Sequence, residues 1–278
     1  MTVEKVATNA IDAAFARLKA EGRTALIPFL TIGDPDLDAS LALIREMEAA
    51  GADMIELGVP YSDPLADGPV IQRASQRALR GKLTTILDVM VIARRAKEAG
   101  SKLPFILFTY YNPILQLGFD RFFDLAQANN ISGMIVPDLP IEEDEEFRAL
   151  AETHGLHLIP LVAPTSSQRV SRIAKKARGF VYCVSSLGVT GERATFASDI
   201  DAFLDTVRSA TDVPIAIGFG ISNREQVARF ESRCDGVIVG SAIVRKVEEQ
   251  EEKLRDPATR DEGARAVGDF VRELKGAK

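Results

Sequence analysis

Residues 53–69 read Asp-Met-Ile-Glu-Leu-Gly-Val-Pro-Tyr-Ser-Asp-Pro-Leu-Ala-Asp-Gly-Pro, and this segment is the best guide to the architecture. Its first half is almost continuously apolar, which predicts a short β-strand buried on both faces. Alternation along the strand places Met54, Glu56 and Gly58 on one side, where a carboxylate is costly unless paired, hydrogen-bonded or protonated. Asp67 follows on a loop stiffened by Pro and Gly. An acid on a strand and another on the loop after it are typical of an acid–base pair.

The same segment has a plainer interpretation. An acid in a strand often sits at an edge or end that faces water, and aspartates in loops usually form turns or caps. Residues 53–69 alone leave the catalytic and the structural interpretations open.

Short strands rich in Ile, Val and Leu alternate with helices along the rest of the chain. We predict strands at 25–31, 54–59, 104–109, 133–136, 156–162, 179–184, 214–217 and 236–239. Helices are predicted at 3–20, 38–50, 70–80, 84–99, 119–129, 142–153, 167–177, 200–210 and 223–231, and another begins near Ser241. This alternation favours an α/β fold, a (β/α)₈ TIM barrel with an extra N-terminal helix and added helices, over a doubly wound sheet.

No linker or low-complexity segment interrupts the pattern, so we expect residues 1–278 to form a single domain. The charged tail, residues 248–278, has apolar residues at helical spacing and is predicted to be a helix that covers the side of the barrel.

Composition limits the classes of function. The net charge is −6 and no basic stripe is present, which argues against nucleic acid as a main partner. The two cysteines, Cys183 and Cys234, have no paired spacing and suit a reducing compartment as core residues. No apolar run reaches the roughly 18 residues of a membrane span, and the acidic, amphipathic N-terminus resembles no signal or transit peptide. We therefore expect a cytoplasmic protein with no membrane partner.

The active site of such a barrel lies at the carboxyl ends of its strands. Candidate residues at those ends are Glu56, Asp67, Tyr110, Asn112, Asp138, Tyr182, Thr190, Gly191, Gly220 and Gly240, with Phe29 and Ile71 as apolar walls. Glycines cluster after the last three strands, and Ser222 and Ser241 stand at helix N-termini, which together favour a phosphate site. The alternative is that these glycines only form tight turns. No ligands stand at metal-binding spacing, and His154 and His157 are expected to be structural.

These residues resemble the α subunit of tryptophan synthase. The resemblance rests on 56–69 and on Tyr-Tyr-Asn-Pro at 110–113, Pro-Asp-Leu-Pro at 137–140, Gly-Val-Thr-Gly at 188–191, Gly-Phe-Gly-Ile-Ser at 218–222 and Gly-Ser-Ala-Ile-Val at 240–244. The matches run in order from about residue 28 to residue 244, which chance is very unlikely to produce.

The resemblance implies a lyase reaction, the retro-aldol cleavage of indole-3-glycerol phosphate to indole and glyceraldehyde 3-phosphate in tryptophan biosynthesis. It implies Glu56 as the general acid and base, and Asp67 as the partner of the indole N–H. It also implies that Phe29, Ile71, Tyr110, Tyr182 and Thr190 bind substrate, with Thr190 on a closing loop. Gly191, Gly220, Gly240 and Ser241 would hold the phosphate.

The family also implies a partner, a β subunit that carries pyridoxal phosphate and receives indole in an αββα assembly, while this chain needs no cofactor. Three loops are expected to face the β subunit: the loop that starts at Tyr61, the loop at Asn112–Pro113 and the loop at 138–140. Two alternatives stay open at this point. One is another phosphate-binding barrel enzyme, such as an isomerase or a synthase of a related indole or ribose phosphate. The other is a non-catalytic protein that only activates a β subunit.

Overall fold

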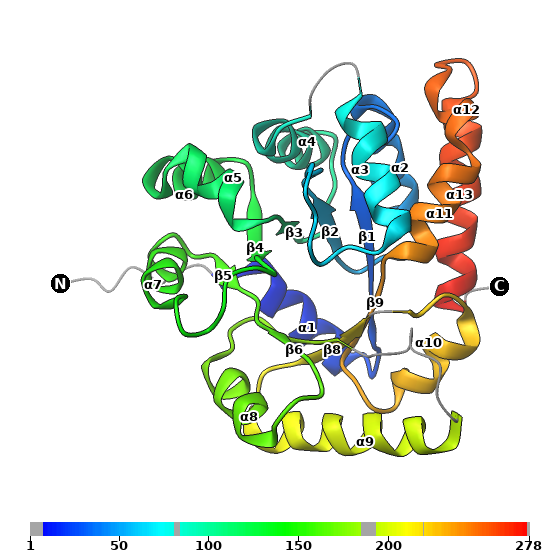
Figure 1. Ribbon diagram of the computed structural model, residues 1–278. Coiled ribbons are helices and arrows are strands. Elements are labelled where there is room, and N and C mark those ends of the chain that lie inside the picture. The colour runs from blue at the N-terminus through cyan, green and yellow to red at the C-terminus, as the bar shows by residue number, and fades with distance from the viewer. Residues whose placement is uncertain (1–7, 81–83, 185–192, 219, 277–278) are drawn as a thin grey trace.

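The computed structural model describes residues 8–80, 84–184, 193–218 and 220–276, with only the backbone for 193–199. Its strands are β1 (Ala25–Thr31), β2 (Ile55–Gly58), β3 (Phe105–Phe108), β4 (Ile131–Ile135), β5 (His157–Leu158), β6 (Leu161–Val162), β7 (Val181–Val184), β8 (Ile215–Gly218) and β9 (Gly236–Val239). Helices surround these strands (Figure 1). They are α1 (Ala10–Ala20), α2 (Leu37–Ala49), α3 (Pro69–Leu79), α4 (Ile86–Glu98), α5 (Tyr111–Leu117), α6 (Phe119–Ala128), α7 (Glu145–Thr153), α8 (Ser167–Lys176), α9 (Arg193–Ala210), α10 (Arg224–Glu231), α11 (Ser241–Glu249), α12 (Glu251–Arg255) and α13 (Arg260–Lys275).

All neighbouring strands pair in parallel, in the order β5-β4-β3-β2-β1-β9-β8-β7-β6. The two end strands, β5 and β6, are consecutive in the chain and separated only by Ile159 and Pro160. The N–H of Ile159 donates to Met134 O of β4 at 2.8 Å, and the N–H of Tyr182 in β7 donates to Pro160 O at 3.0 Å. β5 and β6 thus act as one strand that closes the sheet into a barrel.

The predicted TIM barrel is therefore confirmed, with all eight predicted strands in place. The fifth, predicted at 156–162, is divided into β5 and β6 because Pro160 has no N–H to donate to a ladder. One helix was not predicted. α5 follows β3 directly, and Pro113 is tolerated because it lies in the first turn, where no intrahelical N–H bond is lost.

Alternation sorts the strand residues into two layers. Met54 and Ile106 belong to the cluster inside the barrel, whereas Ile55 and Leu57 belong to the larger cluster between the strands and the helices. Glu56 shares the inward face with Met54, as the two-residue period of a strand requires.

Helix α1 covers the amino-terminal end of the barrel, because its Ile11, Phe15 and Leu18 join the interior cluster. It begins later than the predicted residue 3: Asn9 caps it by accepting the N–H of Ile11 at 2.8 Å. The Asn9 amide also donates to Ser132 O at 2.7 Å, so the cap ties α1 to β4. Residues 3–7 of the predicted helix lie outside the described residues.

The tail continues as α12 and α13, and α13 packs along α2 on the side of the barrel (Figure 1). A Cβ added at Gly268 would lie 3.1 Å from Glu46 O, so the two helices approach closely. The tail is helical and lies on the side of the barrel, as predicted, but it forms two helices, α12 and α13, in place of the one expected. Within the described part of the chain there is no helix suited to crossing a membrane.

Candidate active site

Glu56 lies on β2 with only 1% of its surface exposed, on the inward face of the barrel. Burial raises the pKa of its carboxyl from the ordinary 4.5 to about 8. Among the described residues, its Oε1 atom has no hydrogen-bond partner. A carboxyl in this state is protonated at neutral pH and free to give its proton to a group that enters the barrel.

This pKa predicts a loss of stability at alkaline pH. The unfolded chain ionises Glu56 above pH 4.5, whereas the folded chain keeps it protonated up to about pH 8. The contribution of protonated Glu56 to the free energy of unfolding is therefore fully present below pH 4.5. It is lost as the pH rises from 4.5 to about 8. Relative to Glu56→Gln, we expect the free energy of unfolding of the wild type to fall by on the order of 4 kcal/mol between about pH 5 and pH 9.

Urea unfolding of both proteins across this pH range measures the difference. The variant serves as the control, because its amide does not titrate. A difference between the two proteins that stays constant with pH would contradict the assignment of a raised pKa to Glu56.

Tyr182 of β7 lies close enough to Glu56 for the two to interact. Burial, together with the negative charge of Glu56, raises the pKa of the Tyr182 hydroxyl well above its ordinary value. The ring crosses the end of β8, where a Cβ on Gly218 would come within 2.5 Å of the hydroxyl oxygen. Gly218 is therefore required so that Tyr182 can reach across the mouth of the barrel.

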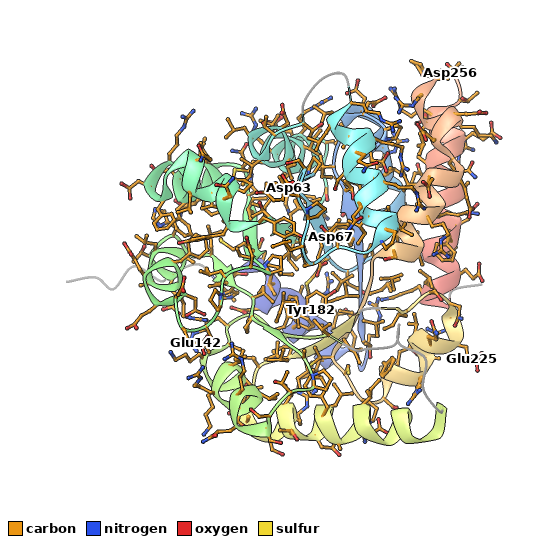
Figure 2. All side chains as sticks on the ribbon, viewed as in Figure 1. Asp63, Asp67, Glu142, Tyr182, Glu225 and Asp256 are labelled. Atoms are coloured by element: carbon orange, nitrogen blue, oxygen red, sulfur yellow. The ribbon has the colours of Figure 1, made fainter. Side chains whose placement is uncertain are left out.

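Asp67 is held on the loop between β2 and α3. The Tyr110 hydroxyl donates to Asp67 Oδ2 at 3.0 Å and accepts the N–H of Ala66 at 2.9 Å. The Gln72 side chain donates to Asp67 O at 2.9 Å. Burial raises the pKa of the Asp67 carboxyl, and the hydrogen bond from Tyr110 opposes that shift. Figure 2 shows Asp67 and Tyr182 near the centre of the ring of helices, whereas Glu142, Glu225 and Asp256 lie at its edge.

The loops after β2, β3 and β4 are joined to one another. The ring of Tyr61 stacks on Tyr110 with centroids 4.8 Å apart, and the Asn112 amide donates to the Tyr61 hydroxyl at 3.5 Å. The Asp138 carboxylate accepts the N–H of Tyr111 at 2.9 Å. Three loops that sequence motifs singled out separately thus form one connected surface at the mouth.

The other side of the mouth carries the glycine turns. β8 and β9 are neighbours, so Gly220 and Gly240 follow adjacent strands. Gly220 has a φ of +80°, which favours glycine, and Gly240 precedes α11 as an N-cap with no side-chain capping bond. Ser241 opens α11, whose first N–H groups have no intrahelical acceptor and can bind an anion. Asn223, rather than the preceding Ser222, caps α10.

Phe29 and Ile71 connect the two sides. Phe29 of β1 pairs in register with Glu56, and its ring occupies the space that a Cβ on Gly58 would need, 2.4 Å from Phe29 Cζ. A Cβ on Gly240 would lie 3.8 Å from Phe29 and 4.0 Å from Ile71. Glu56, the apolar wall of Phe29 and Ile71, and the N-terminus of α11 are therefore neighbours. Of the other predicted site residues, Thr190 and Gly191 lie outside the described residues.

Sequence reasoning missed two residues at this mouth. Phe108 of β3 packs edge-on against Phe29, with ring centroids 5.6 Å apart, and shares its cluster. Thr31, opposite Gly58, has a buried hydroxyl without a partner among the described residues. Thr31 could have been found from the sequence, because it is a polar residue at the end of an apolar strand. Glu56 was found in a similar way, as a polar residue within an apolar strand.

The two histidines and the two cysteines have structural surroundings. His154 stacks on Phe123, and His157 lies 2.9 Å from Asp12. Cys183 and Cys234 are buried free thiols, as expected. No cluster of three or more potential metal ligands occurs within the described ranges.

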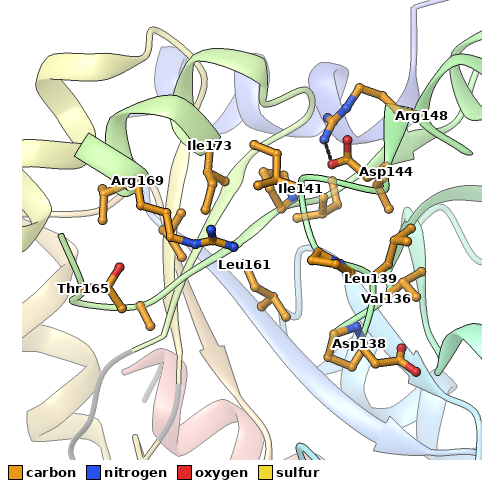
Figure 3. A pocket seen from close by; sticks show the side chains of 18 residues that line it. Val136, Asp138, Leu139, Ile141, Asp144, Arg148, Leu161, Thr165, Arg169 and Ile173 are labelled. Carbon is orange, nitrogen blue, oxygen red and sulfur yellow. Dashed lines mark hydrogen bonds and ion pairs between the residues drawn. The ribbon is translucent and has the colours of Figure 1, made fainter. Parts of the chain in front are cut away.

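A cavity of about 420 Å³ lies beside the mouth, between α7 and α8 (Figure 3). Its walls are mostly apolar, with side chains such as Leu139, Ile141 and Ile173, and Arg148 pairs with Asp144 at one end. Glu56 and the amide groups at the start of α11 do not line this cavity. We therefore assign the candidate site to the barrel mouth.

This geometry is suited to acid–base chemistry on a substrate that enters the barrel mouth. The class of protein that the fold and the site define is a (β/α)₈ barrel enzyme. A family model described as tryptophan synthase alpha chain matches residues 15–271. The chain belongs to the tryptophan synthase alpha chain family, whose members are lyases.

Two curated relatives illustrate the similarity. The tryptophan synthase alpha chain of Geobacillus kaustophilus is 54% identical over 245 residues, covering 88% of this chain and 90% of that protein. The alpha chain of Geobacillus thermodenitrificans is 51% identical over 249 residues, covering 90% and 91%.

Solved structures agree. Tryptophan synthase subunit alpha from Legionella pneumophila superposes with a TM-score of 0.86 at 34% identity, covering 97% of this chain and 98% of the other. A chain of Mycobacterium tuberculosis tryptophan synthase gives a TM-score of 0.83 at 36% identity, covering 96% of both.

Proposed function

We propose that this chain cleaves indole-3-glycerol phosphate to indole and glyceraldehyde 3-phosphate at the barrel mouth. Membership of the family supports this retro-aldol reaction. The observation that carries the assignment to this site is the buried, inward-facing carboxyl of Glu56, with its pKa of about 8. An aldol cleavage of this kind needs a group that can give up and take back a proton near neutral pH.

In the proposed mechanism, Glu56 donates its proton to C3 of the indole ring, which leaves a positive charge at the ring nitrogen. The bond between C3 and the side chain then breaks, and its electron pair flows through C2 to that nitrogen, which restores the aromatic indole. The side-chain hydroxyl becomes the aldehyde and gives its proton to the Glu56 carboxylate. Glu56 thus ends the cycle protonated, as it began.

Asp67 is proposed to accept a hydrogen bond from the indole N–H and to stabilise the positive charge that develops there. The hydrogen bond that the Tyr110 hydroxyl donates to Asp67 Oδ2, at 3.0 Å, supports this role because it holds the carboxylate in place. Tyr110 and Tyr182 are proposed to position the substrate, with Phe29 and Ile71 as the apolar wall.

Gly220, Gly240 and Ser241 are proposed to bind the phosphate through backbone N–H groups. Two further roles stay predictions: Thr190 on a loop that closes over the substrate, and Gly191 as another contact to the phosphate.

Gly240→Val tests the phosphate site. A Cβ there would be in ordinary contact with Phe29 and Ile71, so the two methyl groups of valine would extend into the space at the start of α11, where the phosphate would sit. Because charge-assisted hydrogen bonds contribute about 1.5–3 kcal/mol each, we expect KM to rise roughly tenfold or more and kcat to change less.

Steady-state kinetics separate these two effects, and competitive inhibition by glycerol 3-phosphate should weaken by the same factor as substrate binding. A variant that loses kcat while keeping both KM and the inhibition constant would argue against a phosphate site at Gly240.

Family membership implies a tryptophan synthase β-subunit partner. We propose that two α and two β chains assemble as αββα, that pyridoxal phosphate belongs to the β subunit with no cofactor in this chain, and that the complex is cytoplasmic. The connected loops at the mouth support a docking surface there, since Leu65 is 90% exposed and Leu115 on α5 is also exposed. Large exposed apolar side chains mark interaction sites when they lie together on one surface.

The direct test is to mix the purified chain with indole-3-glycerol phosphate and to measure indole, with and without a β subunit. We expect slow release by the chain alone and faster release in the complex. No indole release in either condition, together with faster turnover of the β subunit, would favour a non-catalytic activator. A synthase that closes the indole ring would need a catalytic Lys at the end of a strand. None of the described strands ends in Lys, which argues against that alternative.

A further inference from the structure

Arg77 on α3 is the centre of a largely buried ionic group that joins α3, α11 and the loop after β1. It is 7% exposed, and its guanidinium makes two parallel hydrogen bonds to the Asp34 carboxylate, Nε to Oδ1 and Nη2 to Oδ2, both at 2.8 Å. Its third nitrogen, Nη1, donates to Glu248 Oε1 at 2.6 Å. A bidentate pair of this kind fixes the relative orientation of the groups it joins, and a lysine cannot reproduce it.

The three residues come from three elements that each reach the candidate site. Arg77 belongs to α3, which starts at Pro69, two residues after Asp67. Glu248 belongs to α11, whose N-terminus is the proposed phosphate site. Asp34 lies in the loop after β1, the strand that carries Phe29.

The same elements also meet through apolar contacts at the other end of α3. Ile71 and Ala74 of α3 pack in one cluster with Phe29 of β1 and Val244 of α11. α3 is therefore held at its start by this apolar cluster and near its end by Arg77. Two attachments along a rigid helix of 11 residues fix its direction, and with it the position of the loop that carries Asp67.

We infer that Arg77 is a positioning residue for the cleavage reaction: it holds α3 against α11 and the β1 loop so that Asp67 stands at the correct distance from a substrate whose phosphate is bound at α11. This inference rests on the proposed roles of Asp67 and Gly240. Arg77 acts through α3 and takes no part in the chemistry itself.

The test compares Arg77→Lys with Arg73→Lys. Arg73 is a matched control, because it lies one turn earlier on α3 and binds the same Glu248, at 2.8 Å, from a half-exposed position without contacting Asp34. For cleavage of indole-3-glycerol phosphate, Arg77→Lys is expected to lower kcat about tenfold with KM changed less than about twofold. Arg73→Lys should stay within about twofold of the wild type for both constants.

A double-mutant cycle then separates positioning from general destabilisation. If Arg77 acts through Asp67, Arg77→Lys should lower kcat less than about twofold in an Asp67→Asn background. Glu248→Gln, which leaves the Arg77–Asp34 pair in place, should show a smaller loss of kcat with the same dependence on Asp67.

An equal fold-loss from Arg77→Lys in both backgrounds would overturn the inference, as would wild-type kcat in that variant. If Arg77→Lys fails to fold, the Glu248→Gln cycle decides in the same way. Failure of the proposed function is a different result, because the wild-type chain would then release no indole at all.

Discussion

Replacing Glu56 by Gln is expected to lower kcat for indole-3-glycerol phosphate cleavage by about 10³-fold, with KM changed less than about threefold. Gln is similar in size to the protonated acid and keeps the apolar packing around residue 56, so substrate binding should survive. Its amide cannot pass a proton to C3 of indole or take one from the side-chain hydroxyl. Steady-state indole release measures both constants.

The unfolding experiments at acidic pH provide the control for this variant, because a folded Glu56→Gln protein shows that lost turnover is chemical. Turnover within tenfold of the wild type would remove Glu56 from the role of general acid and base.

Asp67→Asn is expected to lower kcat by about 10²-fold, the effect typical of removing one group that stabilises charge in a transition state. Asn retains an oxygen that can accept the Tyr110 hydroxyl, which now bonds Asp67 Oδ2 at 3.0 Å, so the loop should keep its place. The negative charge that we propose faces the indole nitrogen is lost. Measuring kcat and KM for the isolated chain separates this effect from any change in docking to a β subunit.

Asp63→Asn is the matched control for Asp67→Asn, since Asp63 lies on the same loop, is exposed, and accepts a hydrogen bond from Ser62 at 2.6 Å. We expect its kcat in the isolated chain to stay within about twofold. Equal losses in both variants would mean that the loop tolerates no change of charge, and Asp67 would lose its specific role.

The barrel could be predicted from the sequence because its strands are short, apolar and regularly spaced. β9 matches the predicted residues 236–239, and β1 matches 25–31. The inward direction of Glu56 also followed from sequence, because a two-residue period leaves a strand residue only two faces. That residues 1–278 form one domain stays a prediction.

Contacts between distant segments could not be predicted in the same way. Nothing in the motif around Tyr110 indicates that its hydroxyl bonds Asp67, since the two lie on loops after different strands. Arg77 reads as one more polar residue on an amphipathic helix, and only the fold brings Asp34 and Glu248 to it. Sequence patterns report local periodicity, whereas these side chains are defined by neighbours far along the chain.

The ionisation of Glu56 itself tests the central claim most directly. The infrared difference spectrum between the wild type and Glu56→Gln isolates the band of the protonated carboxyl, which can be followed as the pH rises. We predict that the band persists through neutral pH and disappears with a midpoint near the pKa of about 8. A midpoint near the ordinary value of 4.5 would contradict the account, because Glu56 would then have no proton to donate at neutral pH.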